Sequence, residues 1–253
     1  MKTIWITGGS TGIGAATAEK FAKNNWRVVI SSRSEDKLIK TKNNIIEKSQ
    51  NEEIFAIKCD ISKRDEVYEA INNIEQNIGP IDLALLNAAA YSPNKSQEFI
   101  IKNYELLIDT NLKGTLYCIE TLEQIMKKRK KGHISIVTSP AGYAGLPTAG
   151  AYGMTKAGLI NLAESLFFDL KKNGIEISII NPGFIESEST SLNSFPMPFL
   201  KTSKYAAEKI FIGLTKTKKF EIFFPFFFII LLKTLRILPY RLYFFIVNKI
   251  TGL

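Results

Sequence analysis

The apolar positions of the chain fall into short continuous runs separated by longer stretches with helical spacing. Apolar runs of roughly 4–8 residues between turn residues are typical of buried strands, whereas recurrence every three to four positions indicates a helix. The pattern predicts strands over residues 3–7, 27–31, 54–58, 81–86, 134–138, 175–180 and 220–224. It predicts helices up to about residue 24, over 35–49, 63–77 and 99–130, after residue 150, and over 203–215.

This alternation predicts an α/β fold of the doubly wound, Rossmann type. Strands separated by helices of this length favour right-handed crossovers and a parallel sheet with helices on both faces. In such a sheet of about seven strands, the ligand site lies beyond the carboxyl ends of the strands. We expect residues 1–225 to form one domain, followed by a separate tail over residues 226–253.

A glycine-rich turn directly follows the first predicted strand. Residues 7–14 read TGGSTGIG and lead into a helical pattern. Glycines permit a tight turn and let backbone N–H groups approach a pyrophosphate at the helix N-terminus. The spacing is not the GxGxxG of the general dinucleotide fingerprint, but strand, turn and helix occur in the required order. We expect a dinucleotide to contact Gly8, Ser10, Thr11, Gly12, Ile13 and Gly14.

The end of the second predicted strand bears on the choice between NAD and NADP. Sites selective for NAD tend to carry Asp or Glu there, to bind the ribose 2′-hydroxyl. This chain has Ser32 and Arg33 instead, and a guanidinium can pair with a 2′-phosphate. We therefore predict NADP(H) as the cofactor in preference to NAD(H). In the alternative, Arg33 points to solvent or pairs with Glu35 or Asp36.

Polar residues follow two further strands. Asp60 and Ile61 come after the third strand, and Asn87 and Ala88 after the fourth, so both pairs are expected to line the adenosine half of the crevice. Either pair can equally be a loop cap. Asn111 lies among apolar residues of a long helical stretch, and a buried asparagine needs partners. We expect it to hold a local helix distortion and a water.

The candidate chemistry lies between residues 139 and 156. In a helix starting near residue 150, Tyr152 and Lys156 stand at i and i+4 and project from one face. A free tyrosine has a pKa of about 10 and is a poor proton carrier at neutral pH. A positive charge from Lys156 or an oxidised nicotinamide would favour the phenolate. Ser139, at a strand end, can hydrogen-bond a substrate carbonyl. The alternative is that the tyrosine–lysine pair is only a solvated helix face.

The last motif is NPGF at residues 181–184. Pro182 and Gly183 are expected to turn the chain across the mouth of the crevice. Residues 184–203 are rich in serine and proline and are predicted to form a flap over a substrate.

Composition excludes several other classes of site. Cys59 and Cys118 lie in apolar patterns, so we interpret both as packing residues without a disulfide or metal role, as suits a reducing compartment. The single histidine, His133, stands at a strand start and is interpreted as structural. Metal sites and serine–histidine triads are therefore not expected.

The net charge of +9 does not indicate a nucleic-acid partner. The lysines are spread over helices, and the basic cluster at 127–132 lacks the interleaved aromatic residues of an RNA or DNA surface. An anionic membrane surface stays open as a partner. The first strand pattern begins by residue 3, which leaves no room for a signal peptide and favours a cytoplasmic location.

Together these motifs resemble the short-chain dehydrogenase/reductase family over roughly residues 2–225. The resemblance implies that Tyr152 is the catalytic acid/base, that Lys156 lowers its pKa and binds the nicotinamide ribose, and that Ser139 orients the substrate oxygen. It implies that Asn111 anchors a proton-relay water and that the backbone of Ile185 meets the carboxamide. It also implies a homodimer or homotetramer formed through the long helices.

The chain departs from the family pattern at three places. The usual NNAG or NAG element reads NAAA at 87–90, so Ala89 stands at a usual glycine position. Pro140 directly follows the serine, where it can reshape the substrate wall, and Ser187 replaces a common threonine. None of these changes removes a catalytic group.

Residues 222–247 are unlike the rest of the chain. The longest uncharged apolar run, 222–232, has eleven residues, against about 20 needed to cross a bilayer. We expect two short helices broken at Pro239, with Lys233, Arg236, Arg241 and Lys249 reaching lipid headgroups. In this interpretation residues 222–250 make a peripheral contact with the cytoplasmic membrane face. In the alternative, the tail packs on its own domain or on a second subunit.

The sequence thus predicts an NADP(H)-dependent oxidoreductase that transfers hydride between nicotinamide and a carbonyl or alcohol of an apolar, lipid-like substrate. Two alternatives use the same fold without turnover: a dinucleotide-binding regulator and a membrane-associated scaffold. The presence of Ser139, Tyr152 and Lys156 together favours the enzyme.

Overall fold

A seven-stranded parallel sheet forms the centre of the molecule. The computed structural model describes residues 1–92, 99–188, 190–193 and 197–251. The strands follow the order β3-β2-β1-β4-β5-β6-β7. Their bounds are β1 Thr3–Thr7, β2 Arg27–Ser32, β3 Ile54–Lys58, β4 Ile81–Leu86, β5 Gly132–Val137, β6 Ile175–Pro182 and β7 Glu221–Phe224. The chain order reverses between β1 and β4, so the predicted doubly wound fold is confirmed.

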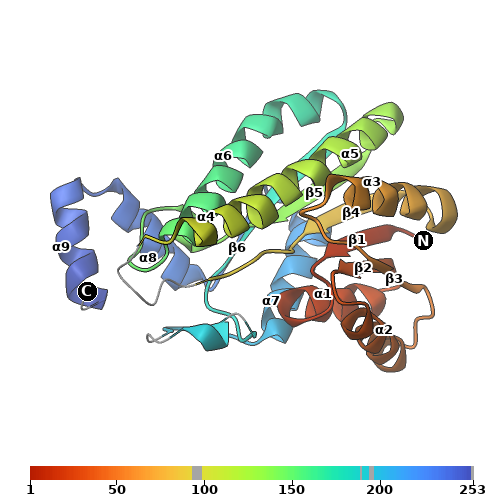
Figure 1. Cartoon of the computed structure of the whole chain (residues 1–253), viewed down its shortest axis with the longest axis horizontal. Helices are drawn as coiled ribbons and strands as arrows, with labels where there is room; N and C mark the ends of the chain where they lie inside the picture. Colours follow the sequence, from red (N-terminus) through yellow and green to blue (C-terminus); the bar gives the residue numbers. More distant parts are fainter. Residues whose placement is uncertain (93–98, 189, 194–196, 252–253) are drawn as a thin grey trace.

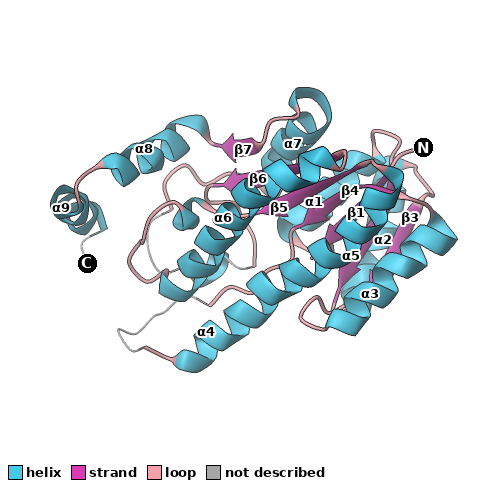
Figure 2. Cartoon of the chain, turned by 90° about the horizontal axis from the view of Figure 1, so that it is seen from above, coloured by secondary structure: helices cyan, strands magenta, loops and turns pink. Residues whose placement is uncertain are grey.

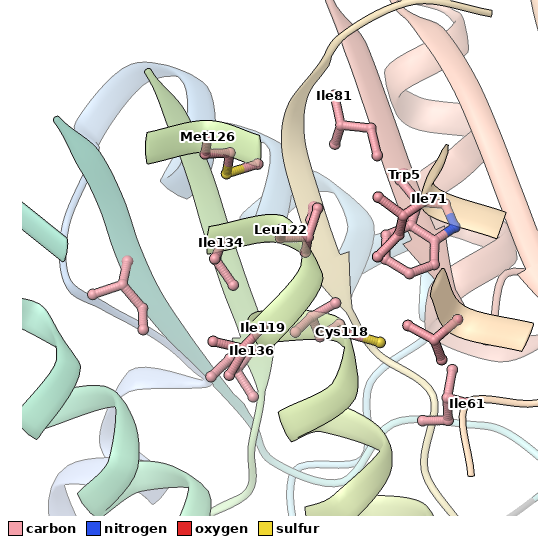
Figure 3. Packing of buried hydrophobic residues seen from close by; sticks show 14 of the residues in the cluster. Trp5, Ile61, Ile71, Ile81, Cys118, Ile119, Leu122, Met126, Ile134 and Ile136 are labelled. Carbon is pink, nitrogen blue, oxygen red and sulfur yellow. The ribbon is translucent and has the colours of Figure 1, made fainter. Parts of the chain in front are cut away.

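Helices cover both faces of this sheet (Figure 1). One face carries α1 Gly12–Ala22, α2 Glu35–Ser49 and α7 Ser203–Ile212, and the other carries α3 Arg64–Asn73, α4 Ile101–Leu107, α5 Gly114–Arg129 and α6 Gly150–Lys172. Each covering helix places an apolar stripe on the sheet, which makes two core layers. Figure 3 shows the layer under α3 and α5, where Trp5 packs among aliphatic side chains.

Buried polar side chains of the described core are hydrogen-bonded, with the Thr17 hydroxyl as the exception. The Trp5 indole N–H donates to the Ser31 hydroxyl at 2.9 Å. His133 contacts the Ser178 hydroxyl through Nε2 at 2.8 Å, and burial lowers its pKa to about 4. Both cysteines are free and buried, and burial raises the pKa of Cys59 to about 12. These placements confirm the packing role of the cysteines and the structural interpretation of His133.

The long helix predicted over 99–130 is interrupted by a π-helical turn, Ile108–Lys113. In this turn the Gly114 N–H bonds to the carbonyl of Asp109, and the Thr115 hydroxyl donates to the Asn111 carbonyl at 2.7 Å. The distortion expected at Asn111 is therefore present. Similar turns end α3 and α7, at Ile74–Ile78 and Gly213–Thr217, so the two helices predicted there are shorter than their apolar patterns.

The tail forms two helices, α8 Phe226–Ile237 and α9 Tyr240–Thr251, separated at Pro239 as expected. Figure 2 shows them leading from β7 to the end of the molecule farthest from the N-terminus. Leu235, Tyr243 and Val247 form a small cluster with Ala144 of the main domain. Along the ranges that the structure describes, no helix has the length and apolarity to cross a membrane.

Candidate active site

Asn87 and Ala88 support the glycine-rich turn between β1 and α1 through hydrogen bonds. Both of their backbone N–H groups donate to the Thr7 hydroxyl, at 3.0 and 3.1 Å. The Asn87 amide also donates to the carbonyls of Thr7 and Gly8, both at 3.1 Å. A Cβ on Gly8 would lie 2.8 Å from the Ala88 Cα. The structure thus gives the predicted Asn87–Ala88 pair a supporting role under the turn.

The turn itself requires glycine at several positions. Gly8 and Gly12 have φ angles of +64° and +53°, which side-chain-bearing residues rarely adopt. A Cβ on Gly14 would lie 2.2 Å from the Gly8 carbonyl oxygen. Thr11 occupies the N-cap of α1 without a side-chain cap, so the first N–H groups of the helix are available to an anion. Ile13 packs beneath them, and the Ser10 carbonyl accepts from Thr41 at 2.8 Å.

The end of β2 lies against this turn, because the Gly9 N–H donates to the Ser31 carbonyl at 3.0 Å. Ser32 follows, and its hydroxyl contacts the Ser34 carbonyl at 3.4 Å. Arg33 is exposed, and within the described ranges it has no ion pair with Glu35 or Asp36. Its guanidinium is therefore free for the phosphate role that the sequence predicts.

Asp60 and Ile61 lie in the loop that follows β3. The Asp60 carboxylate accepts from the backbone N–H and hydroxyl of Ser62, at 3.0 and 2.8 Å. Ile61 is buried against Gly114, where an added Cβ would lie 2.9 Å from its side chain. Asp60 thus caps the loop, as the alternative interpretation expected. A contact of Asp60 or Ile61 with the adenosine stays a prediction.

Ser139, Tyr152 and Lys156 come together at the carboxyl end of β5. Pro140 begins a short 3₁₀ turn, and the Ser139 hydroxyl accepts from Ala141 N–H at 3.2 Å. Tyr152 lies in the first turn of α6 and is hydrogen-bonded to Ser139. Lys156 is 2% exposed, donates to the Val137 carbonyl at 2.8 Å and has its Nζ 5.5 Å from the centre of the Tyr152 ring. The solvated-face alternative is wrong, because the ammonium is buried.

Burial governs the proton affinities of this group. It raises the pKa of Tyr152 to about 12, although the hydrogen bond from Ser139 acts in the opposite direction. It lowers the pKa of Lys156 to about 8. The expectation that Lys156 depresses the phenol pKa is not met by the protein groups alone, because the ammonium is directed to Val137. The effect of an oxidised nicotinamide, the other charge considered from the sequence, stays a prediction.

Asn111 is fully buried and joins two parts of the site. Its side chain accepts from Ala90 N–H at 2.7 Å and donates to the Ala90 carbonyl at 3.1 Å. It also donates to the Thr155 hydroxyl, on α6, at 3.2 Å. Asn111 therefore fixes the loop after β4 relative to the helix that carries Tyr152, and its water-relay role stays a prediction.

The chain after β6 folds over the glycine turn. Pro182 ends the strand, and Gly183 N–H donates to the Phe224 carbonyl at 2.7 Å. Ile185 is buried and forms an isolated bridge with Lys201. A Cβ on Gly12 would lie 3.5 Å from the Cβ of Ser187. The expected flap over 184–203 thus starts next to the glycine-rich turn, and its residues 189 and 194–196 lie outside those described.

Tyr91 is a site residue that the sequence reasoning missed. Its ring meets the Tyr152 ring edge-on, with centroids 5.0 Å apart, and its hydroxyl donates to the Asn193 side chain at 2.5 Å. The only sequence signal is an aromatic residue directly after NAAA. Tyr91 therefore connects Tyr152 to the expected flap.

A cleft of about 670 Å³ lies beside this group. The turn after Ser139 and the α6 residues Met154 and Glu164 line one side, and Lys233 and Arg236 of α8 line the other. Its lining does not include Ser139, Tyr152 or Lys156.

Comparisons with known proteins agree with this geometry. The family model for short chain dehydrogenases matches residues 2–197. An uncharacterised oxidoreductase of Myxococcus xanthus is 30% identical over 96% of this chain and 94% of its own length. A 3-oxoacyl-[acyl-carrier-protein] reductase of Staphylococcus epidermidis is 33% identical over 75% of this chain and 78% of its own.

Solved structures show the same fold. The structure described as ElxO with NADP bound has a TM-score of 0.79 at 28% identity, and covers 88% of this chain and 97% of its own. A Sphingobium yanoikuyae short-chain dehydrogenase in complex with NADPH has a TM-score of 0.80 at 20% identity, with 89% of each chain covered. The match over residues 2–197, together with Ser139, Tyr152 and a buried Lys156 beside a glycine turn, shows that this chain belongs to the short-chain dehydrogenase family of oxidoreductases.

Proposed function

We propose that the chain is an NADP(H)-dependent oxidoreductase that interconverts a carbonyl and an alcohol on an apolar, lipid-like substrate. One observation carries the proposal: the partly buried Tyr152 phenol is hydrogen-bonded to Ser139 one helical turn from Lys156. Tyr152 can donate a proton, Ser139 can orient an oxygen and Lys156 is a cation, which are the groups that carbonyl reduction requires.

The protein's part in the reaction is proton transfer and orientation. Bound NADPH would supply the hydride that forms the new C–H bond at the carbonyl carbon. Ser139 holds the carbonyl oxygen by a hydrogen bond, and Tyr152 gives that oxygen its proton as the C=O π pair becomes an O–H bond. With a pKa of about 12, Tyr152 is protonated at neutral pH and suited to act as the acid. Lys156, with a pKa of about 8, is charged there and can bind the nicotinamide ribose.

The preference for NADP rests on Arg33. It follows β2, whose end is bonded to the glycine turn, and its guanidinium is exposed. A charge-assisted hydrogen bond contributes roughly 1.5–3 kcal/mol, which corresponds to about ten- to hundredfold in affinity. The NADP bound by ElxO, a relative of the fold at 28% identity, supports the same choice.

The aromatic residues at the flap support the proposed substrate class. Phe228 of α8 lies with its ring centre 5.5 Å from that of Phe184 and 6.1 Å from that of Phe199. Aromatic and apolar side chains of this kind favour an acyl chain over a charged metabolite. The 33%-identical reductase from Staphylococcus, whose name specifies 3-oxoacyl groups, supports this assignment.

Direct binding of NADPH and NADH to the purified protein tests the cofactor. We expect Arg33→Ala to weaken NADPH about tenfold and to leave NADH nearly unchanged, because only NADPH carries the 2′-phosphate. Arg64→Ala, which removes another exposed guanidinium, on α3 and paired with Glu120, is the control. Equal losses for both dinucleotides would remove the phosphate role of Arg33.

Turnover of a 3-oxoacyl thioester tests the chemistry. We expect Tyr152→Phe to lower kcat by about 10²–10⁴-fold, because general acid catalysis is lost. NADPH binding should stay within about twofold, which separates chemistry from folding. Tyr68→Phe, on the exposed side of α3, is the control. Turnover unchanged in Tyr152→Phe would refute the assignment.

A further inference from the structure

The exposed side of α8 is apolar. Its exposed residues are Phe226, Phe227, Ile230, Leu231, Thr234, Arg236 and Ile237. At 100° per residue all of these except Arg236 fall on one side of the helix, and Thr234 is the only polar member. Phe227 is 81% exposed. A helix that faces water seldom places a large apolar side chain in this orientation. The side of α8 that would normally be polar is therefore a contiguous apolar surface.

Helix α9 also carries exposed aromatic and basic residues. Tyr240 and Phe244 stack with ring centres 5.8 Å apart, and Phe245 is 65% exposed. Arg241 and Lys249 are exposed on the same helix. From residue 222 to residue 253 the sequence contains no Asp or Glu, so no acidic side chain of the tail offsets these charges.

Both helices are fixed to the domain by their opposite sides. Ile229 is fully buried, and Phe228 packs so closely on Gly183 that an added Cβ would lie 3.1 Å from its ring. The Tyr243 hydroxyl donates to the Gly145 carbonyl at 2.6 Å, and Lys233 pairs with Glu221 of β7. The apolar side is thus presented outward by a folded scaffold.

We propose that the outer face of α8 and α9, defined by Phe226, Phe227, Ile230, Leu231, Tyr240, Phe244 and Phe245 with Arg241 and Lys249, is a docking surface for an anionic lipid bilayer. Apolar and aromatic side chains interspersed with Arg and Lys suit the boundary between acyl chains and headgroups. This surface is separate from the catalytic group and does not depend on turnover.

Charge and length favour a bilayer surface over the other occupants. A symmetric contact with a second copy would bring Arg241 and Lys249 near their own counterparts, with no acidic residue of either tail to pair with them. Each helix has 12 residues and is about 18 Å long, against about 30 Å of hydrocarbon, so it can lie in the interface but not cross it.

Docking would also bring the flap close to the lipid. Phe228 links α8 to Phe199, which is exposed, and to Phe184, which follows the NPG turn. An apolar substrate could then pass from the bilayer to the flap with little exposure to water. This last step alone depends on the proposed function.

Co-sedimentation of the full-length protein with vesicles tests the proposal. The vesicles are phosphatidylcholine alone, or phosphatidylcholine with about one third phosphatidylglycerol. We expect binding to the anionic vesicles and at least about tenfold weaker binding to the neutral ones. Phe227→Ser and Phe245→Ser together should lower binding to anionic vesicles by about tenfold or more. Arg241→Glu with Lys249→Glu should remove the preference for anionic lipid.

Phe168→Ser on α6 is the matched control, because Phe168 is 67% exposed and far from the tail in sequence. Its vesicle binding should equal that of the wild type. All substitutions are at exposed positions, so NADPH affinity and melting temperature should be unchanged. Phe227→Ser alone replaces the double variant if the latter fails this folding check.

Two outcomes would overturn the proposal. One is equal sedimentation of the wild type and the Phe227→Ser, Phe245→Ser variant with anionic vesicles. The other is a wild type that binds neither vesicle, with the same variant reducing the oligomer size in analytical ultracentrifugation. That result would assign the face to a second copy of the chain.

Discussion

Lys156 is a charged side chain held almost entirely out of water. Among the described residues its ammonium donates to the Val137 carbonyl, at 2.8 Å, and burial lowers its pKa from 10.5 to about 8. The neutral amine can still donate this hydrogen bond, so the cost of burial falls on the ammonium form. Lys156 is therefore protonated at neutral pH, but its pKa is lower than that of a lysine in water.

The lowered pKa of Lys156 predicts how the free energy of unfolding changes with pH. Between pH 8 and 10.5 the unfolded chain carries a proton on Lys156 that the folded chain has lost, so folding stability contributed by this residue rises with pH. Relative to Lys156→Met, the wild type should gain about 2 kcal/mol of unfolding free energy between pH 8 and 9.5. Below pH 8 the difference between the two proteins should level off.

Urea unfolding of both proteins across this pH range measures the effect. The comparison cancels the other titrating groups, which are the same in both chains. A difference that stays constant from pH 7 to 9.5 would show that Lys156 keeps its ordinary pKa in the folded protein.

The residues that the sequence could identify were those whose relation is local. Tyr152 and Lys156 are one turn apart on a single helix, so spacing alone places them on one face. Tyr91 and Asn193 are 102 positions apart, and no periodicity reports their hydrogen bond. The pKa of Tyr152 was also inaccessible, because it depends on burial by several elements.

At the scale of elements, the strands agree with the sequence to within two residues, whereas several helices do not. Apolar periodicity reports which side of a helix is buried, but it does not report the change of hydrogen-bond partner that makes a π turn. The turn Ile108–Lys113 keeps its apolar side inward while it directs Asn111 to Ala90. The buried asparagine was the only signal of this distortion.

Tyr91 joins two loops, and this predicts a role in positioning. Tyr91→Phe keeps the ring contact with Tyr152 and removes the hydrogen bond to Asn193, for which the net contribution is about 1 kcal/mol. We expect the KM of the substrate to rise about fivefold with kcat within about twofold, because the flap is held less firmly. Tyr91→Ala should also lower kcat, since it removes the ring beside the phenol.

A double-mutant cycle isolates the contact. Asn193→Ala alone should raise KM to a similar degree, and combining it with Tyr91→Phe should add little further. Fully additive effects on KM would mean that the two side chains act independently.

At the scale of the whole molecule, the sequence predicted the sheet and the break in the tail, but not how the tail is attached. Glu221, at the start of β7, attaches the tail to the domain. Its carboxylate accepts from the Tyr143 hydroxyl at 2.5 Å and the Asn181 amide at 2.8 Å, and it pairs with Lys233 of α8. One side chain thus links the turn after Ser139, the end of β6 and the tail. Such a convergence of four elements has no sequence signature.

Glu221→Ala should therefore loosen the tail as well as lower stability. It leaves the fully buried Asn181 amide and the partly buried Lys233 ammonium without their partner, which we expect to cost about 2–4 kcal/mol of unfolding free energy. Amide exchange in α8 and α9 should rise more than in β1 and β4, because the anchor of the tail is lost first. Glu221→Gln, which can still accept from Tyr143 and Asn181, should cost less. If exchange rose equally throughout the molecule, the tail would be part of the same cooperative unit as the sheet.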